Sequence, residues 1–195
     1  GQGTIREVLR ENNIHLYLKQ WDLDKVKVKF AKHHTSHAAY GYYTQDKPNA
    51  TIMCLDSIGE FETFTIWHGG ENDRKLRKIY SQGYPHSIGL FYSAMTQRMG
   101  FTPQRDEYLI AKHAAAGKPG RYMNIMLDEI IDIETRPIVK IKKNLHRGCL
   151  DWHPEIKTVQ DIADLAATTQ KVFEACVHVL SDYAKQQTKS NNIAV

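Results

Sequence analysis

Residues 33–60, HHTSHAAYGYYTQDKPNATIMCLDSIGE, predict the central elements of the fold. Their continuous apolar run, residues 50–55, is typical of a strand buried on both faces, while the small and aromatic residues 36–44 favour a helix. Residues 57–60 read as a short glycine-containing turn, and residues 61–67 are rich in β-forming side chains. We therefore predict a helix followed by a β-hairpin.

The same stretch concentrates metal-type ligands. Residues 26–30 alternate apolar residues with lysines, which predicts a strand with one wet face that delivers the histidines at its end, as the buried strand delivers Asp56. Ligands bind outside the carboxyl ends of strands in open α/β sheets. His33 and His37 are four residues apart, so a helix that has begun by His33 presents both rings on one face, and Asp56 can add a third ligand. Histidines at strand-to-helix turns also serve as plain hydrogen-bonding residues, so spacing alone leaves both readings open.

Composition places the chain among soluble globular domains. It has 195 residues with 42% hydrophobic content, enough for one domain with a core. No apolar run approaches the ~20 residues of a membrane span, so we expect no membrane partner. The three cysteines are odd in number and lack CxxC spacing, which predicts reduced thiols and a cytoplasmic location. The net charge of +4 suits phosphate-bearing ligands without requiring a nucleic acid.

Outside the central stretch, helical and strand patterns alternate. Apolar residues at helical spacing and capping residues predict helices over residues 4–20 (broken near Asn12 and Asn13), from Ser87 to Gly100, from Asp106 to Ala116, and over residues 158–187. Residues 74–80 and 192–195 predict strands, the second of them buried. This alternation of elements indicates the α/β class.

Two basic segments leave their roles open. Residues 117–121 can contact a phosphate, although a plain surface loop is the commoner meaning of such a segment. Residues 140–147 can bind nucleic acid, but without interleaved aromatic residues they are more typical of a solvated surface. Gly59 has two readings as well: its backbone can approach a phosphate, or it supplies the positive φ of a turn.

Several ordered motifs resemble one family. They are HHTSHAA at residues 33–39, LDSIGE at 55–60, YPHSIGLFYSAMT at 84–96, GFTP at 100–103 and DEY at 106–108. In this order they resemble the O-carbamoyltransferases of nodulation and antibiotic pathways, with Ser57 and Leu109 as departures where family members usually carry glycine and lysine.

The resemblance implies a fold and a reaction. Residues 1–195 would be an internal part of the N-terminal domain, which is related to the tRNA threonylcarbamoyl-transfer enzymes and has an actin/hexokinase-like (ribonuclease H-like) mixed sheet with flanking helices. A second, YrdC-like domain, absent from these residues, makes carbamoyl adenylate from carbamoyl phosphate and ATP. The first domain passes the carbamoyl group to an acceptor hydroxyl. The fragment alone is expected to be inactive.

The resemblance also implies residue roles. His33, His37 and Asp56 would be ligands of a divalent metal, iron or else zinc, which can polarise the carbamoyl carbonyl as a Lewis acid. Ser57, Gly59 and Glu60 would lie near the nucleotide and acceptor.

Two further residues are candidates for taking the proton of the acceptor hydroxyl, namely His34 and Glu60. The acceptor itself stays open between a small molecule, a nucleoside, a hydroxymethylated DNA base and tRNA, and a homodimer is compatible with the sequence. The alternative function is a nucleic-acid-binding module that uses residues 140–147.

Overall fold

The computed structural model describes residues 13–23, 25–70, 74–135 and 138–195. The chain divides into two compact units, Gly1–Ala31 and Lys32–Val195. In the first unit residues 13–19 are helical, which confirms the last part of the helix predicted over residues 4–20. Residues 4–12 of that prediction lie outside the described residues.

The strand predicted over residues 26–30 is wrong. These residues are irregular, and Val26 and Phe30 are 49% and 54% exposed. A strand needs a neighbour for its backbone hydrogen bonds, and neither described sheet includes residues 26–30. The alternating pattern alone therefore did not suffice to predict a strand, and the histidines do not follow a strand end.

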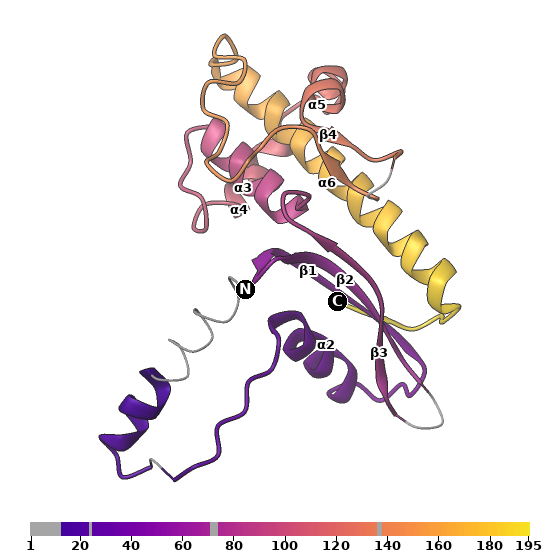
Figure 1. Cartoon of the computed structure of the whole chain (residues 1–195). Helices are drawn as coiled ribbons and strands as arrows, with labels where there is room; N and C mark the ends of the chain where they lie inside the picture. Colours follow the sequence, from indigo (N-terminus) through magenta and orange to yellow (C-terminus); the bar gives the residue numbers. More distant parts are fainter. Residues whose placement is uncertain (1–12, 24, 71–73, 136–137) are drawn as a thin grey trace. The chain divides into compact units, whose positions relative to one another are not determined.

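The second unit is built on a four-stranded mixed sheet with the order β3-β2-β1-β6 (Figure 1). The first three strands, β1 (Ala50–Gly59), β2 (Glu62–Gly69) and β3 (Leu76–Gly83), form an antiparallel meander. Strand β6 (Ile193–Ala194) pairs with β1 in parallel. The hairpin and the strand at the end of the chain are thus confirmed. Ile193 is nevertheless 43% exposed, so its predicted burial is wrong.

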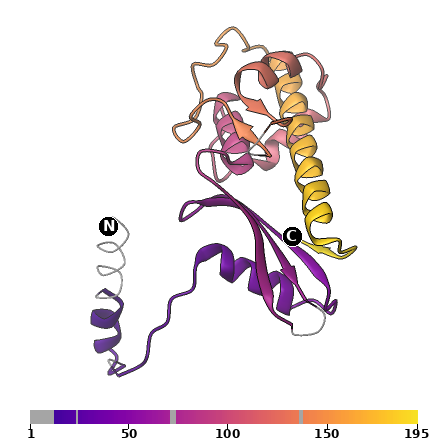
Figure 2. The same ribbon diagram turned by 45° about the vertical axis from the view of Figure 1, so that its right-hand side comes forward.

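Both faces of the sheet are covered by helices (Figures 1 and 2). Helix α2 (His33–Tyr43) packs on one face with Ile52 and Cys54, and helices α3 (Ile88–Arg98) and α6 (Val159–Thr188) pack on the other with Met53 and its neighbours. Successive side chains of a strand point to opposite faces, so the continuous apolar run in β1 is the sequence signature of this three-layer arrangement. The prediction of a strand buried on both faces is confirmed.

Local capping explains where the longer helices begin. The Ser87 hydroxyl accepts a hydrogen bond from the Leu90 main-chain N–H at the start of α3, as predicted. At the start of α6, Thr158 and Asp161 form a reciprocal capping box. The predicted cap at Asp106 is wrong, because α4 (Tyr108–Ala114) begins two residues later and the Asp106 carboxylate accepts the Thr102 N–H instead.

The remaining elements are short. They are helix α5 (Met123–Glu129) and the two-stranded antiparallel sheet of β4 (Ile131–Asp132) and β5 (Lys140–Ile141). The overall class is α/β, with a mixed sheet and flanking helices, as predicted. Cys54, Cys149 and Cys176 are buried free thiols. None of the described helices combines the length and apolar character that a bilayer crossing requires.

Candidate metal centre

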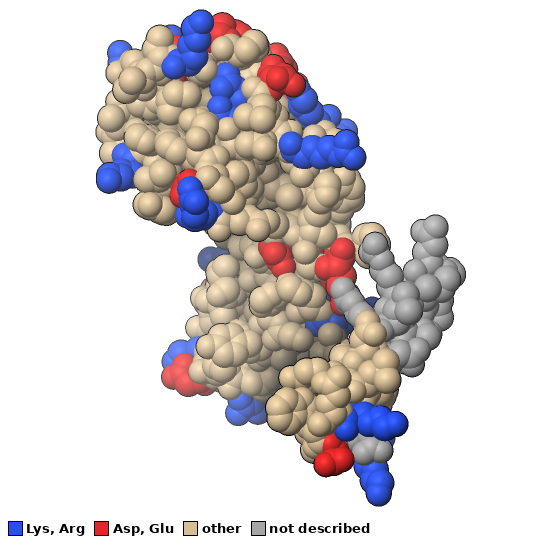
Figure 3. Space-filling view, turned by 90° about the vertical axis from the view of Figure 1, so that its left-hand side faces the viewer, with Lys and Arg blue, Asp and Glu red and all other residues tan. Residues whose placement is uncertain are grey.

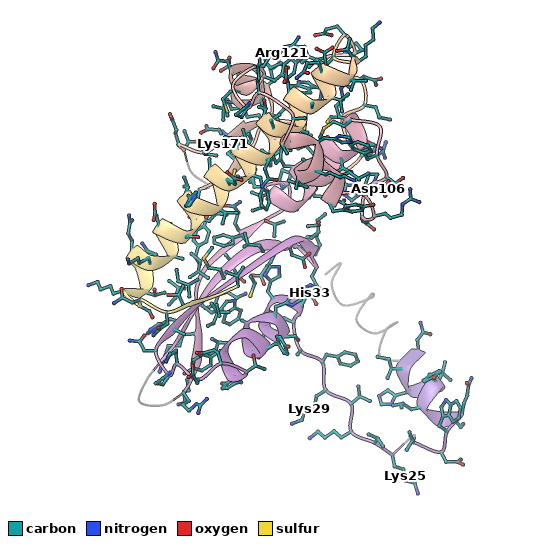
Figure 4. The ribbon with its side chains drawn as sticks, turned by 180° about the vertical axis from the view of Figure 1, so that it is seen from behind. Lys25, Lys29, His33, Asp106, Arg121 and Lys171 are labelled. Atoms are coloured by element: carbon teal, nitrogen blue, oxygen red, sulfur yellow. The ribbon has the colours of Figure 1, made fainter. Side chains whose placement is uncertain are left out.

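Helix α2 places two histidines on one face. It begins at His33, so His33 and His37 are one turn apart, and their ring centroids lie 4.6 Å from each other. Figure 4 shows His33 at the end of α2 that lies beside the sheet. The four-residue spacing therefore has the consequence expected from the sequence.

Asp56 reaches the same point from strand β1. Its Oδ2 lies 2.6 Å from His33 Nε2, and His33 Nε2 lies 2.9 Å from His37 Nε2. The three donor atoms all fall within 4.8 Å of one another, and among the described residues this is the only such group of three. The side chains of His33 and Asp56 are 43% and 27% exposed, so one side of the cluster is open to solvent.

The donor set fits a divalent cation. Two imidazole nitrogens face each other beside a carboxylate oxygen, and a proton on His33 Nε2 cannot serve both neighbours equally well. A cation placed among the three atoms would accept a lone pair from each. Two histidines with one carboxylate and an open side is a ligand set typical of iron and zinc sites.

Asp56 does not lie at a strand end, contrary to the prediction. Strand β1 continues to Gly59, and its register against β2 shifts between Leu55 and Gly59. Within this irregular stretch the Ser87 hydroxyl donates to the Asp56 carbonyl (3.1 Å), and the Ser57 N–H donates to Asp56 Oδ1 (2.6 Å). The carboxylate is therefore oriented by a strand irregularity and by the start of α3 rather than by the carboxyl end of a strand.

Gly59 makes room for the histidine rings. A Cβ at Gly59 would lie 2.5 Å from Cδ2 of His33 and 2.7 Å from Cδ2 of His34. The positive φ of the hairpin turn belongs to the exposed Glu60 (64°) and not to Gly59. Neither sequence-based reading of this glycine described that role, which is the close approach of α2 to β1.

His34 points away from the open cluster into the protein. It is 0% exposed, its Nδ1 lies 2.9 Å from Thr65 Oγ1, and its Nε2 donates to the Glu62 carbonyl at 3.1 Å. Burial lowers the pKa of His34, against an opposing effect of the Glu62 carboxylate. Both ring nitrogens thus have protein partners, and neither is left to accept a proton from an acceptor hydroxyl.

Ser57, on strand β1, packs against the start of α3. The position of a Cβ on Gly89 would be 2.9 Å from Ser57 Oγ and 3.0 Å from Ser57 N, so the first turn of α3 rests on the Ser57 backbone. The N-terminal turn of α3 therefore lies against the strand segment that also carries Asp56.

The loop of residues 117–121 is a structural connection. Arg121 pairs with Asp161 and Asp164 at 2.9 Å each, and the Lys118 N–H donates to Asp164 Oδ1. The Asp164 side chain is 2% exposed. Because its guanidinium is already paired with two carboxylates, Arg121 is not poised to bind a phosphate. The interpretation of residues 117–121 as a plain surface loop is the better one.

The basic segment 140–147 is anchored by apolar residues. Ile141 and Leu145 are buried, and Lys142 Nζ donates to the carbonyls of Leu127 and Asp128. Lys143 and Arg147 are exposed. On the face that Figure 3 shows, the Lys and Arg side chains of the described residues are scattered rather than gathered into one continuous stripe.

Sequence reasoning missed the residues that support the histidines. Thr65 contacts His34, and Trp67 Nε1 donates to Thr65 Oγ1 at 2.8 Å. A usable signal was present, because Thr65 is a polar residue between the apolar Phe64 and Ile66 of a strand buried on both faces. Buried hydroxyls need partners.

Comparisons with known proteins place these features in a family. The family model described as carbamoyltransferase N-terminus matches residues 5–195. The uncharacterized protein sll1178 of Synechocystis sp. is 28% identical over 182 residues, covering 85% of this chain and 29% of the relative. The uncharacterized protein MJ1058 of Methanocaldococcus jannaschii is 31% identical over 221 residues, covering 98% and 36%. Nodulation protein NolNO of Sinorhizobium fredii is 24% identical over 169 residues, covering 84% and 24%.

The chain therefore spans about a quarter to a third of the length of these curated relatives. The match covers nearly all of its residues and includes the histidine cluster, the hairpin and the long helix α6. It agrees with the family that the ordered motifs predicted. The chain belongs to the carbamoyltransferase N-terminus family.

Proposed function

We propose that this chain contributes the metal centre of an O-carbamoyltransferase. The observation that carries the proposal is the convergence of ligand atoms of His33, His37 and Asp56 within 4.8 Å of one another in a chain of this family. In the proposed reaction, carbamoyl phosphate and ATP give carbamoyl adenylate, whose carbamoyl group then passes to an acceptor hydroxyl. A domain outside residues 1–195, of the YrdC-like type, would make the adenylate.

The proposed fold is the actin/hexokinase-like (ribonuclease H-like) arrangement. Two features support it: the antiparallel meander β1-β2-β3, and the parallel strand β6 that joins beside β1 after the helices. In this proposal residues 1–195 are part of the N-terminal domain, which works in the cytoplasm.

The metal, iron or else zinc, would supply Lewis-acid polarisation of the carbamoyl carbonyl. His33 and His37 would hold it from helix α2, and Asp56 would hold it from β1. Ser57 and Gly59 would lie beside the nucleotide. Support comes from the first turn of α3, which rests on Ser57 and offers a helix N-terminus to a phosphate.

In the transfer step the acceptor oxygen would bond to the carbamoyl carbon while the bond from that carbon to the phosphate oxygen breaks. The proton of the acceptor hydroxyl has to leave. Glu60 is the better candidate base, because it is exposed at the hairpin turn, whereas both nitrogens of His34 are already bonded.

The reaction is tested by mass spectrometry of candidate acceptors incubated with the full-length protein, carbamoyl phosphate and ATP. Transfer appears as the mass gain of one carbamoyl group. We expect the gain to require both ATP and His37, and to vanish in His37→Ala. The control is His178→Ala, which removes an exposed histidine from helix α6. Transfer that persists in His37→Ala contradicts the proposed role of the cluster.

A second candidate function is nucleic-acid binding, with a hydroxymethylated DNA base or a tRNA nucleoside as the acceptor. The favouring observation is that Lys143 and Arg147 are exposed on a segment anchored by buried Ile141 and Leu145. Binding that weakens steeply with salt and is lost in Lys143→Glu with Arg147→Glu supports this candidate. If binding to nucleic acid is insensitive to salt or is not detected, a small-molecule acceptor remains. This outcome is the same for a monomer and for a homodimer.

A further inference from the structure

His34 is the buried member of the histidine cluster and has no direct part in the proposed metal site. Its ring centroid lies 5.8 Å from that of His33 and 6.3 Å from that of His37. The ring is 0% exposed, although the helix positions on either side of it, His33 and Thr35, are not buried. Because its imidazole is buried, His34 has a different role from the exposed His33 and His37.

The hydrogen bonds of His34 have one consistent direction. The Glu62 carbonyl can only accept, so His34 Nε2 carries the proton, and in the neutral ring Nδ1 is then an acceptor. The Thr65 hydroxyl therefore donates to Nδ1, and the lone pair of Thr65 Oγ1 accepts the Trp67 Nε1–H at 2.8 Å. The result is a directed chain from Trp67 through Thr65 and His34 to Glu62.

This chain joins helix α2 to strand β2, and His34 also contacts strand β1. Thr65 and Glu62 belong to β2, while β1 contacts His34 through Cys54 Sγ, 3.8 Å from the His34 carbonyl oxygen, and through Gly59. Cys54 and Gly59 lie on either side of Asp56 in the sequence. The His34 ring is bonded to β2 and packs closely on Gly59 of β1, so it lies between the helix that carries His33 and His37 and the strand that carries Asp56.

The anchor on β2 is itself held. The Glu62 carboxylate accepts from Lys78 Nζ at 2.6 Å and from Ser81 Oγ at 2.5 Å, and Lys78 Nζ lies 4.9 Å from the centre of the Trp67 ring. Strand β3 thus fixes both ends of the directed chain. A chain of hydrogen bonds whose two ends are held keeps the side chains within it in place, whereas an isolated hydrogen bond to a mobile residue would not.

We propose that His34, held by Thr65, is a positioning residue that sets the spacing of the three donor atoms of the metal centre. This inference rests on the proposed metal site. Residues that orient metal ligands from behind typically change metal affinity ~10–100-fold when they are substituted. The loss of the Thr65 hydroxyl should therefore weaken binding of the ion, although no donor atom has been removed.

The test is titration of the protein with Co²⁺ alone, followed by calorimetry and by the visible absorption of the bound ion. We expect Thr65→Val and His34→Gln to weaken Co²⁺ binding ~10–100-fold and to alter the absorption bands. Thr65→Ser, which keeps the hydroxyl, should restore both. Thr168→Val is the matched control, because Thr168 is also 0% exposed and hydrogen-bonded, to the carbonyls of Pro119 and Asp164. It should leave Co²⁺ binding unchanged.

The outcomes separate this inference from the proposed function. If His37→Ala abolishes binding while Thr65→Val and His34→Gln bind like the unaltered protein, the positioning role is overturned and the metal site stands. If the unaltered protein does not bind Co²⁺, both fail. Thermal unfolding is recorded for every variant, and affinities are compared only well below the unfolding temperature. If Thr65→Val does not fold, the comparison of His34→Gln with Thr168→Val decides.

Discussion

Two clusters of polar side chains that include aspartates lie at the starts of helices α2 and α6, and their carboxylates have different partners. At α2, His33, His37 and Asp56 turn their donor atoms toward one another on a side open to solvent. At α6, the carboxylates of Asp161 and Asp164 each meet the guanidinium of Arg121. At α2 the ligand atoms converge on one another, whereas at α6 the carboxylates are already paired with a guanidinium. We call the cluster at α6 the saturated cluster.

The difference separates binding from stabilisation. Asp164 accepts hydrogen bonds from Arg121, from the Lys118 N–H and from Gln160 Nε2, so its oxygens have little left to offer a ligand. The hydrogen bond from Arg121, the largest cause, lowers the pKa of Asp164 below its ordinary value. A saturated cluster holds a loop on a helix, whereas converging lone pairs attract a cation.

The largest expected effect is on metal affinity. His33→Ala or His37→Ala removes a donor atom and Asp56→Asn removes the charge of the carboxylate, so metal affinity should fall by more than the ~10–100-fold typical of a supporting residue. The free energy of unfolding should change by less than about 0.5 kcal/mol for His37→Ala, because that side chain is exposed. Calorimetric titration with Zn²⁺ and urea unfolding measure the two quantities. Equal affinities in His37→Ala and His178→Ala would remove the distinction between the clusters.

The second effect is on stability at the saturated cluster. A Cβ at Gly117 would lie 1.9 Å from the Ala163 carbonyl oxygen, so Gly117→Ala should displace the loop from α6 and destabilise the protein by about 1–3 kcal/mol. Metal affinity should stay unchanged. Gly120→Ala is the matched control in the same loop, because nothing lies within 4 Å of the added Cβ. If both variants unfold at the same urea concentration, the close packing of this loop is not important for stability.

A smaller effect is the dependence of stability on pH. Because the pKa of Asp164 is lowered in the folded protein, its contribution is present above its ordinary value of 3.8 and is lost as the pH falls toward the lower folded pKa. The free energy of unfolding should therefore decrease from about pH 5 to pH 3, and less steeply in Asp164→Asn. Urea unfolding across this range measures both slopes. Parallel slopes would show that Asp164 is not stabilised by its partners.

The smallest expected effect concerns Glu60, which follows Gly59 in the sequence. Glu60 is exposed at the hairpin turn and is not among the three converging donors, so Glu60→Gln should leave metal affinity unchanged and shift the free energy of unfolding by less than about 0.5 kcal/mol. Asp56→Asn is its counterpart inside the cluster. Comparing the two by calorimetry shows whether position or negative charge alone attracts the ion. A similar loss of metal affinity in Glu60→Gln and Asp56→Asn would show that negative charge alone attracts the ion.

Much of the fold was accessible from local patterns. The buried run of residues 50–55, the Ser87 cap and the apolar stripe of α6 each predicted their element, because burial and capping leave a direct trace in the sequence. Residues 26–30 show the limit. Their alternation is that of a strand, but pairing depends on a neighbour that no local pattern specifies.

The candidate site was predictable in its members but not in its geometry. The spacing of His33 and His37 and the family motifs singled out the donors. The strand irregularity at Asp56 and the space at Gly59 are tertiary features, since each depends on what packs against the strand. For the same reason His34 was a candidate base from its neighbours in sequence, and its partner Thr65, 31 residues away, was not found.

The central claim is that His33, His37 and Asp56 together hold one metal ion. The most direct measurement is the anomalous diffraction signal of crystals of the protein grown with Fe²⁺ or Zn²⁺. We predict one strong peak bonded to His33 Nε2, His37 Nε2 and an Asp56 carboxylate oxygen, at about 2.0–2.2 Å from each if the ion is zinc. A peak elsewhere, or one that persists unchanged in His37→Ala, would contradict it.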